Sequence, residues 1–164
     1  MKKSLSFMAI IYLLTGSGQL WAQESISHDG FRLQDLYNSS KVESRWQMGF
    51  HVDWETGEAI SVAQKPTTTH CSAYVAALLK RAGIYILRPP EHKAKNLANA
   101  QFDYLSSVAG QQAGWRELNQ GVQQVQEYAN RGYFVVAVVK NDNPTKPGHI
   151  AFIYPRPVVG SQLN

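Results

Sequence analysis

The chain has very little cysteine: Cys71 is the only one among its 164 residues, so no disulfide can form within it. CxxC and HxxxH spacings are both missing, which argues against a dedicated metal site. Basic residues are scattered, and the short group between Lys80 and Arg88 is the only hint of a cluster. A nucleic-acid partner is therefore not expected, because such proteins usually carry a denser basic stripe.

Long apolar runs are also scarce, and the one that stands out, Phe7 to Leu14, follows two lysines at the N-terminus. Small and polar residues lead from it to Ala22, which is the layout of a secretory signal peptide, and the run is short for a membrane span. We therefore expect residues 1–23 to be a signal peptide and residues 24–164 to form one periplasmic or secreted domain, with no stable membrane insertion after cleavage. The alternative is an uncleaved membrane anchor.

The spacing of apolar residues predicts a mixed domain. The clearest pattern is an amphipathic helix over residues 71–82, with Thr68 or Thr69 as N-cap and Gly83 as its stop. Weaker helical patterns cover 31–37, 91–108 and 122–129. Strands are expected at 48–54, 59–62, 133–139 and 149–154, and a break in regular structure at 110–114. Because a hairpin-length loop joins the last two strands, the sequence predicts an α+β domain with an antiparallel sheet.

Cys71 is the first candidate for chemistry. An unpaired cysteine in an exported chain suggests a reactive thiol or an intermolecular bond, although a buried inert thiol is the plainer alternative. Its expected place in the first turn of a helix favours reactivity, because unpaired N–H groups and the helix dipole gather there. These groups favour a thiolate and can also donate to an oxyanion that develops on a carbonyl substrate.

Among the five histidines, His149 is the best candidate for a base. It opens an apolar strand directly after Pro147 and Gly148, where a rigid element can hold an imidazole at a cleft. A solvent-facing histidine at a strand end is the alternative. His70 neighbours Cys71, but adjacent helix residues do not face each other, so it is expected to lie either on the substrate side or behind the catalytic residues as a supporting residue. For His51 there is no spacing argument.

Two stretches together resemble a known family. The first comprises CSAYV at 71–75 and LLKRAG at 78–83, and it is similar to the nucleophile helix of the NlpC/P60 and CHAP group of cell-wall peptidases and amidases. The second, PGHIAFI at 147–153, resembles the histidine strand of that group. The resemblance implies a papain-like fold, a nucleophile at Cys71, a base at His149 and no cofactor. It also implies a peptidoglycan stem peptide as substrate.

The sequence departs from the family pattern at three points. Many members have an acidic residue before the cysteine, where this chain has His70. The connection from Cys71 to His149 is longer than usual. A third polar residue should follow the histidine strand and orient the imidazole, and only Gln162 and Asn164 offer suitable chemistry there.

The leading interpretation is thus an exported cysteine peptidase or amidase that cleaves an amide bond in the cell wall through a thioester. Three alternatives stay open: an acyltransferase that acts on lipid or protein, a non-catalytic envelope-binding module on the same scaffold, and a toxin. The sequence does not identify an inhibitor or immunity protein as a partner. The tryptophans at 46, 54 and 115 could line a groove, but we expect them to be partly buried in the core, because tryptophan is usually highly buried.

Overall fold

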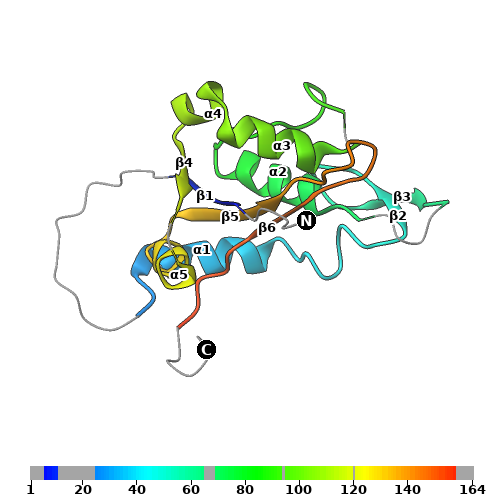
Figure 1. Cartoon of the computed structure of the whole chain (residues 1–164). Coiled ribbons are helices and arrows are strands. Elements are labelled where there is room, and N and C mark those ends of the chain that lie inside the picture. Colours follow the sequence, from blue (N-terminus) through cyan, green and yellow to red (C-terminus); the bar gives the residue numbers. More distant parts are fainter. Residues whose placement is uncertain (1–5, 11–24, 65–68, 94, 120, 158–164) are drawn as a thin grey trace.

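The structure is a computed structural model that describes residues 6–10, 25–64, 69–93, 95–119 and 121–157. Helices and antiparallel strands both occur, as the α+β prediction requires (Figure 1). In chain order the elements are β1 (Ser6–Ile10), α1 (His28–Ser39), β2 (Phe50–Val52), β3 (Ala59–Val62), α2 (Cys71–Arg81), α3 (Leu97–Ser106), α4 (Val108–Gln112), β4 (Trp115–Leu118), α5 (Val122–Asn130), β5 (Phe134–Val139) and β6 (His149–Phe152).

The main sheet has the strand order β4-β1-β5-β6, and each neighbouring pair is antiparallel. Since β1 is antiparallel to both β4 and β5, those two strands run parallel, and α5 connects them across β1. The predicted hairpin of the last two strands is confirmed, with Val139 opposite His149. Strands β2 and β3 form a separate two-stranded hairpin.

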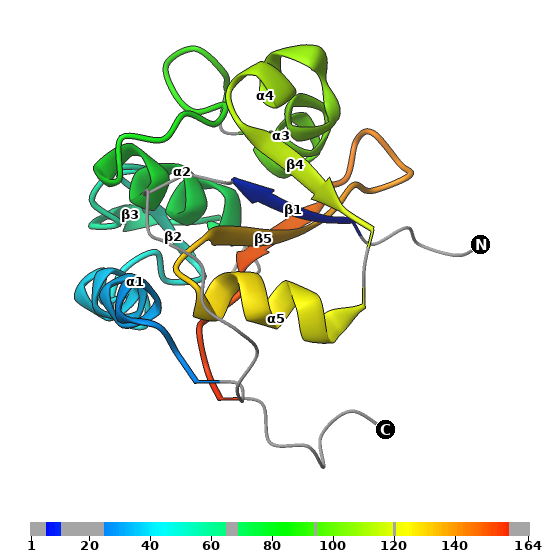
Figure 2. The same cartoon turned by 90° about the vertical axis from the view of Figure 1, so that its left-hand side faces the viewer.

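Helices cover both faces of the main sheet (Figures 1 and 2). Helices α2 and α3 lie on one face, and their apolar residues form a common core with β5 and β6: Val75, Leu79, Leu105, Val136, Val138 and Ile150. Helix α5 lies on the other face and packs Val125 and Ala129 against Val135. Helix α1 packs Leu33 and Tyr37 against Leu78 of α2.

Helix α2 confirms the strongest sequence prediction, but its N-cap residue differs from the predicted one. Val75, Leu78 and Leu79 are buried at the expected spacing, and Gly83 follows the helix with a positive φ of 74°. The predicted threonine N-cap is wrong, because His70 occupies that position and makes no capping hydrogen bond with its side chain. The first turn is thus left without a side-chain cap.

The expected break at residues 110–114 is confined to the turn at Ala113 and Gly114, because α4 extends to Gln112 and β4 begins at Trp115. The Ser107 hydroxyl caps α4 by accepting a hydrogen bond from the Gly110 amide at 3.1 Å. Trp115, the first residue of β4, is fully buried, and its Nε1 donates to the Tyr85 carbonyl at 3.1 Å. The buried Trp115 indole therefore anchors a segment that was expected to be a loop and that forms strand β4.

Two helix starts also differ from the sequence prediction. Helix α1 begins earlier than expected, because the Ser27 hydroxyl accepts from the Gly30 amide at 3.0 Å and caps it. Helix α3 begins later than expected, because its N-cap Asn96 has a left-handed backbone with φ 56°. Such a conformation cannot continue a right-handed helix.

Part of the apolar run expected to be a signal peptide forms β1, an inner strand of the sheet. The rest of that run and the expected cleavage position, Ala22, lie outside the described residues. Within the described part of the chain, no helix is both long and apolar enough to cross a bilayer. Removal of residues 1–23 would take β1 away and leave the facing edges of β4 and β5 without their present partner.

The core on the α2 face is expected to dominate stability. Leu79 is 0% exposed, so Leu79→Ala should lower the free energy of unfolding by about 2–5 kcal/mol through lost burial and a residual cavity. Ile60 on β3 is 71% exposed, and Ile60→Ala should change stability by less than about 0.5 kcal/mol. Urea denaturation followed by circular dichroism measures both, and equal midpoints for the two variants would contradict this assignment of the core.

Candidate active site

Cys71 is the first residue of α2 and its thiol is free and half-buried. The first helical hydrogen bond of α2 runs from the Tyr74 amide to the His70 carbonyl at 2.9 Å. The amides of Cys71, Ser72 and Ala73 come before it, so helix geometry gives them no intrahelical acceptor. The sulfur thus lies beside a group of donors that can stabilise negative charge.

His149 is the first residue of β6 and is exposed. The loop before it is held by Asn99 of α3, whose Nδ2 donates to the Lys146 carbonyl at 2.9 Å and whose Oδ1 accepts from the Asn141 amide at 3.0 Å. A side chain at Gly148 would overlap the Val139 carbonyl and Asn99 Oδ1. The glycine before His149 is therefore required by close packing of the loop.

One pocket of about 540 Å³ joins the two predicted residues, since Cys71 and His149 both line it. Its wall comes from the end of α1 and the loop after it, the start of α2, and β6. The other lining residues are Tyr37, Asn38, Val42, Glu43, Trp46, Met48, Thr69, His70, Tyr74, Ile150, Ala151, Phe152 and Tyr154. Residues that are 78 positions apart in the sequence thus share one cleft because α2 packs on the hairpin of β5 and β6.

Aromatic rings form the inner wall of this pocket, and sequence reasoning did not assign them to it. The Tyr74 ring meets Phe152 edge-on at 5.9 Å and Trp46 at 5.2 Å between centroids. The Ser40 hydroxyl donates to the Tyr37 carbonyl at 2.5 Å, which leaves the Tyr74 hydroxyl to donate to Ser40 Oγ at 3.1 Å. Burial raises the pKa of the Tyr74 phenol, so it stays neutral near pH 7.

Trp46 is held in place by the turn between β2 and β3. Its backbone is left-handed with φ 49°, its amide donates to the Gly57 carbonyl at 3.0 Å, and its Nε1 donates to the Trp54 carbonyl at 3.2 Å. Asp53 closes the turn by accepting from the Thr56 amide at 2.7 Å, and that bond lowers the pKa of the Asp53 carboxyl. Of the three tryptophans expected in the core, Trp115 is buried there, whereas Trp46 is half-buried at the pocket.

The remaining histidines take different positions. His70 lines the pocket, and its Nε2 donates to the Phe50 carbonyl at 2.6 Å, which ties β2 to the start of α2. His51 is exposed on β2 and is not part of the pocket wall. His149 is thus the histidine at the pocket whose position fits a base, and His70 has a fixed partner on β2.

No orienting residue for His149 emerges within the described residues, where none of the hydrogen bonds involves its imidazole. The predicted candidates Gln162 and Asn164 lie outside these residues. Glu43 supplies the pocket wall with a carboxylate, and Asn38 supplies an amide whose Oδ1 accepts from the Tyr154 hydroxyl at 3.2 Å. In the described part of the chain, no group of three or more metal-ligand residues is gathered at one place.

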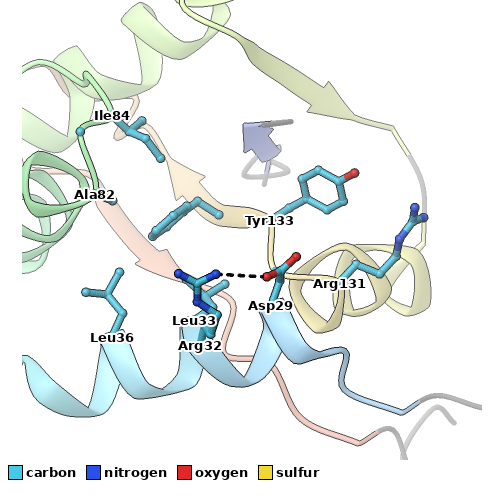
Figure 3. A pocket seen from close by; sticks show the side chains of 11 residues that line it. Asp29, Arg32, Leu33, Leu36, Ala82, Ile84, Arg131 and Tyr133 are labelled. Carbon is cyan, nitrogen blue, oxygen red and sulfur yellow. Dashed lines mark ion pairs between the residues drawn. The ribbon is translucent and has the colours of Figure 1, made fainter. Parts of the chain in front are cut away.

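A second pocket, of about 570 Å³, lies at the other end of α2 (Figure 3). Leu33, Leu36 and Ile84 contribute to its apolar lining, and Asp29 forms a long ion pair with Arg32 at 3.8 Å at its edge. Neither cysteine nor histidine lines this pocket. It is slightly larger than the pocket at Cys71, and its ionisable lining residues are Asp29, Arg32, Arg131 and Tyr133.

Comparisons with known proteins add no assignment: no family model, curated protein or solved structure matches the chain.

Gly57→Ala should disturb the pocket through Trp46. Gly57 has φ 73°, and an added Cβ would overlap the Trp46 indole. We expect a loss of about 1–3 kcal/mol of unfolding free energy and a changed near-UV circular dichroism signal from the displaced ring. Gly83→Ala is the matched control, because Gly83 has φ 74° but nothing within 4 Å of the new Cβ. Indistinguishable spectra for both variants would show that the turn does not position Trp46.

Proposed function

We propose that this protein is a cysteine hydrolase of the papain-like class that cleaves an amide or peptide bond. The observation that carries the proposal is that Cys71, at the start of α2, and His149, at the start of β6, line the same pocket. A helix packed on an antiparallel hairpin, with the nucleophile on the helix and the base on the strand, agrees with the papain-like fold. The resemblance of residues 71–83 and 147–153 to the NlpC/P60 and CHAP group supports the same conclusion.

In the proposed mechanism His149 accepts the thiol proton of Cys71, and the thiolate attacks the carbonyl carbon of the substrate. Backbone amides of Cys71 and Ser72 stabilise the oxyanion of the tetrahedral intermediate. The C–N bond breaks as His149 returns the proton to the leaving amine, and a thioester remains on Cys71. Water then attacks the thioester with His149 again as base, which releases the acid and restores the thiol.

The proposed substrate is the stem peptide of bacterial peptidoglycan, reached after export to the periplasm or beyond. This part of the proposal rests on the family resemblance and on the signal-peptide pattern of residues 1–23. The pocket volume falls within the range of small-molecule and peptide sites. An acyltransferase or a non-catalytic envelope-binding module on this scaffold would share the pocket but would not release amines from peptidoglycan.

Alkylation of Cys71 tests the proposed pair directly. We expect iodoacetamide to modify the protein readily at pH 6–7, because His149 takes up the thiol proton of Cys71 in the proposed pair. His149→Ala should slow alkylation at that pH by at least about tenfold, because the base that forms the thiolate is gone. Intact-mass spectrometry over time gives the rates.

His28→Ala is the control for this experiment, since the His28 side chain is 88% exposed on α1 and does not line the pocket. It should alkylate like the unaltered protein. Slow alkylation with no response to His149→Ala would overturn the catalytic pair. Release of new amino groups from purified peptidoglycan by the unaltered protein, but not by Cys71→Ala, then tests the reaction itself.

Export makes a separate prediction about the N-terminus. In a bacterial host that expresses the whole chain, we expect the periplasmic protein to begin near Gln23, because cleavage follows Ala22 in the signal-peptide pattern. The intact mass of the fractionated protein measures this. A periplasmic species that still begins at Met1 would contradict cleavage and would make β1 a permanent strand of the mature sheet.

A further inference from the structure

The pocket at Cys71 runs along a sheet edge. Strand β6 is the last in the order β4-β1-β5-β6 and pairs only with β5 among the described strands. All four residues of β6, His149–Phe152, line the pocket. Successive side chains of a strand point to opposite faces, so a pocket bordered by four consecutive residues lies along the backbone edge.

The hydrogen-bond pattern shows which backbone groups face outward. The Ile153 amide donates to the Val135 carbonyl at 2.9 Å, so this pair exchanges hydrogen bonds across the hairpin. Bonded pairs alternate in an antiparallel ladder, and the same register makes Ala151 and His149 the next residues bonded to β5. The N–H and C=O groups of Ile150 and Phe152 therefore point away from β5, toward the pocket.

These outward groups have no other acceptor or donor within the described part of the chain. The situation changes just beyond β6, where the Tyr154 carbonyl accepts from Gln126 Nε2 at 2.9 Å and the Pro155 carbonyl accepts from Gln34 Nε2 at 2.7 Å. Side chains of α5 and α1 thus occupy the backbone past Phe152. The free edge is limited to the stretch that borders the pocket and ends at His149.

We propose that β6 binds the substrate as an added strand: an extended peptide segment pairs with the backbone of Ile150 and Phe152 and places its scissile amide between Cys71 and His149. This inference rests on the proposed function and names its substrate class. The two outward positions are about 7 Å apart, which matches alternate residues of an extended peptide. A glycan or a lipid chain does not present amide donors and acceptors at that interval.

The surroundings of the edge suit such a peptide. Phe152 and Tyr74 supply an apolar wall beside the backbone groups, and Met48, 63% exposed, borders the same space. Main-chain hydrogen bonds would supply affinity with little dependence on side chains, while the aromatic wall selects the residue next to the scissile bond. Leaving the outward groups unpaired under a bound lipid would cost free energy, which disfavours an acyl chain as the occupant.

Amide hydrogen exchange tests this binding mode. The probe is the disaccharide tetrapeptide released from purified peptidoglycan, added at millimolar concentration to the full-length Cys71→Ala variant so that it is not consumed. Exchange at Ile150 and Phe152 should slow by at least about tenfold, since each amide gains an acceptor. Ala151 and Ile153 are internal controls, because their amides already bond to β5 and should change little.

Unchanged exchange at Ile150 and Phe152 overturns this inference, whether the fragment binds elsewhere or does not bind. Cys71→Ser repeats the measurement, and protected Ala151 and Ile153 amides in either variant confirm that the hairpin is folded. Cleavage of the fragment by the unaltered protein is measured separately. Cleavage without protection rejects the added strand and keeps the hydrolase, whereas protection without cleavage keeps the added strand and rejects the hydrolase for this substrate.

Discussion

The packing of α2 on β6 is the contact on which the candidate site depends. Tyr74 lies three residues after Cys71 on the helix, Phe152 lies three residues after His149 on the strand, and the two rings meet edge-on at 5.9 Å. Val75 and Leu79 of α2 join Ile150 in the same buried cluster. These contacts fix α2 against β6, and Cys71 and His149 are the first residues of these two elements.

The pocket lies beside this contact, and its other walls come from the end of α1 and the loop that follows it. The turn that begins at Asp53 holds Trp46 against Tyr74, and the Tyr74 hydroxyl is tied to Ser40 at the end of α1. The wall opposite β6 is thus built from hydrogen-bonded loops and aromatic rings. A wall of this kind is rigid enough to keep a cleft open while the strand edge stays accessible.

Sequence patterns predicted the elements on which Cys71 and His149 lie, and they failed where single contacts decide the structure. The α2 helix follows from an apolar pattern of 3.6 residues, and the β5–β6 hairpin follows from two apolar runs joined by a short loop. The strand at Trp115 was missed because it depends on one indole bonded to the distant Tyr85 carbonyl. The location of Trp46 at the pocket depends on its left-handed backbone conformation, and no apolar pattern in the sequence indicates such a conformation.

The same limit applies to the site. Cys71 and His149 could be chosen from residue type and local setting, and the structure places them at one pocket. Asn99, which anchors the loop before His149, could not be found in this way, because its partners Lys146 and Asn141 are more than 40 positions away. The free edge of β6 depends on strand order, which is set by the whole fold.

Strand order also separates the candidate site from the fate of the N-terminal segment. Strand β5 lies between β1 and β6, and the edge that borders the pocket is the one that faces away from β5. Loss of β1 with a signal peptide would change the far side of β5 and the setting of β4. Tyr74 contacts Phe152 directly, and Val75 and Leu79 of α2 join Val136, Val138 and Ile150 of the hairpin in one buried cluster. The described residues that line the pocket all lie between Tyr37 and Tyr154, so a chain processed after Ala22 retains each of them.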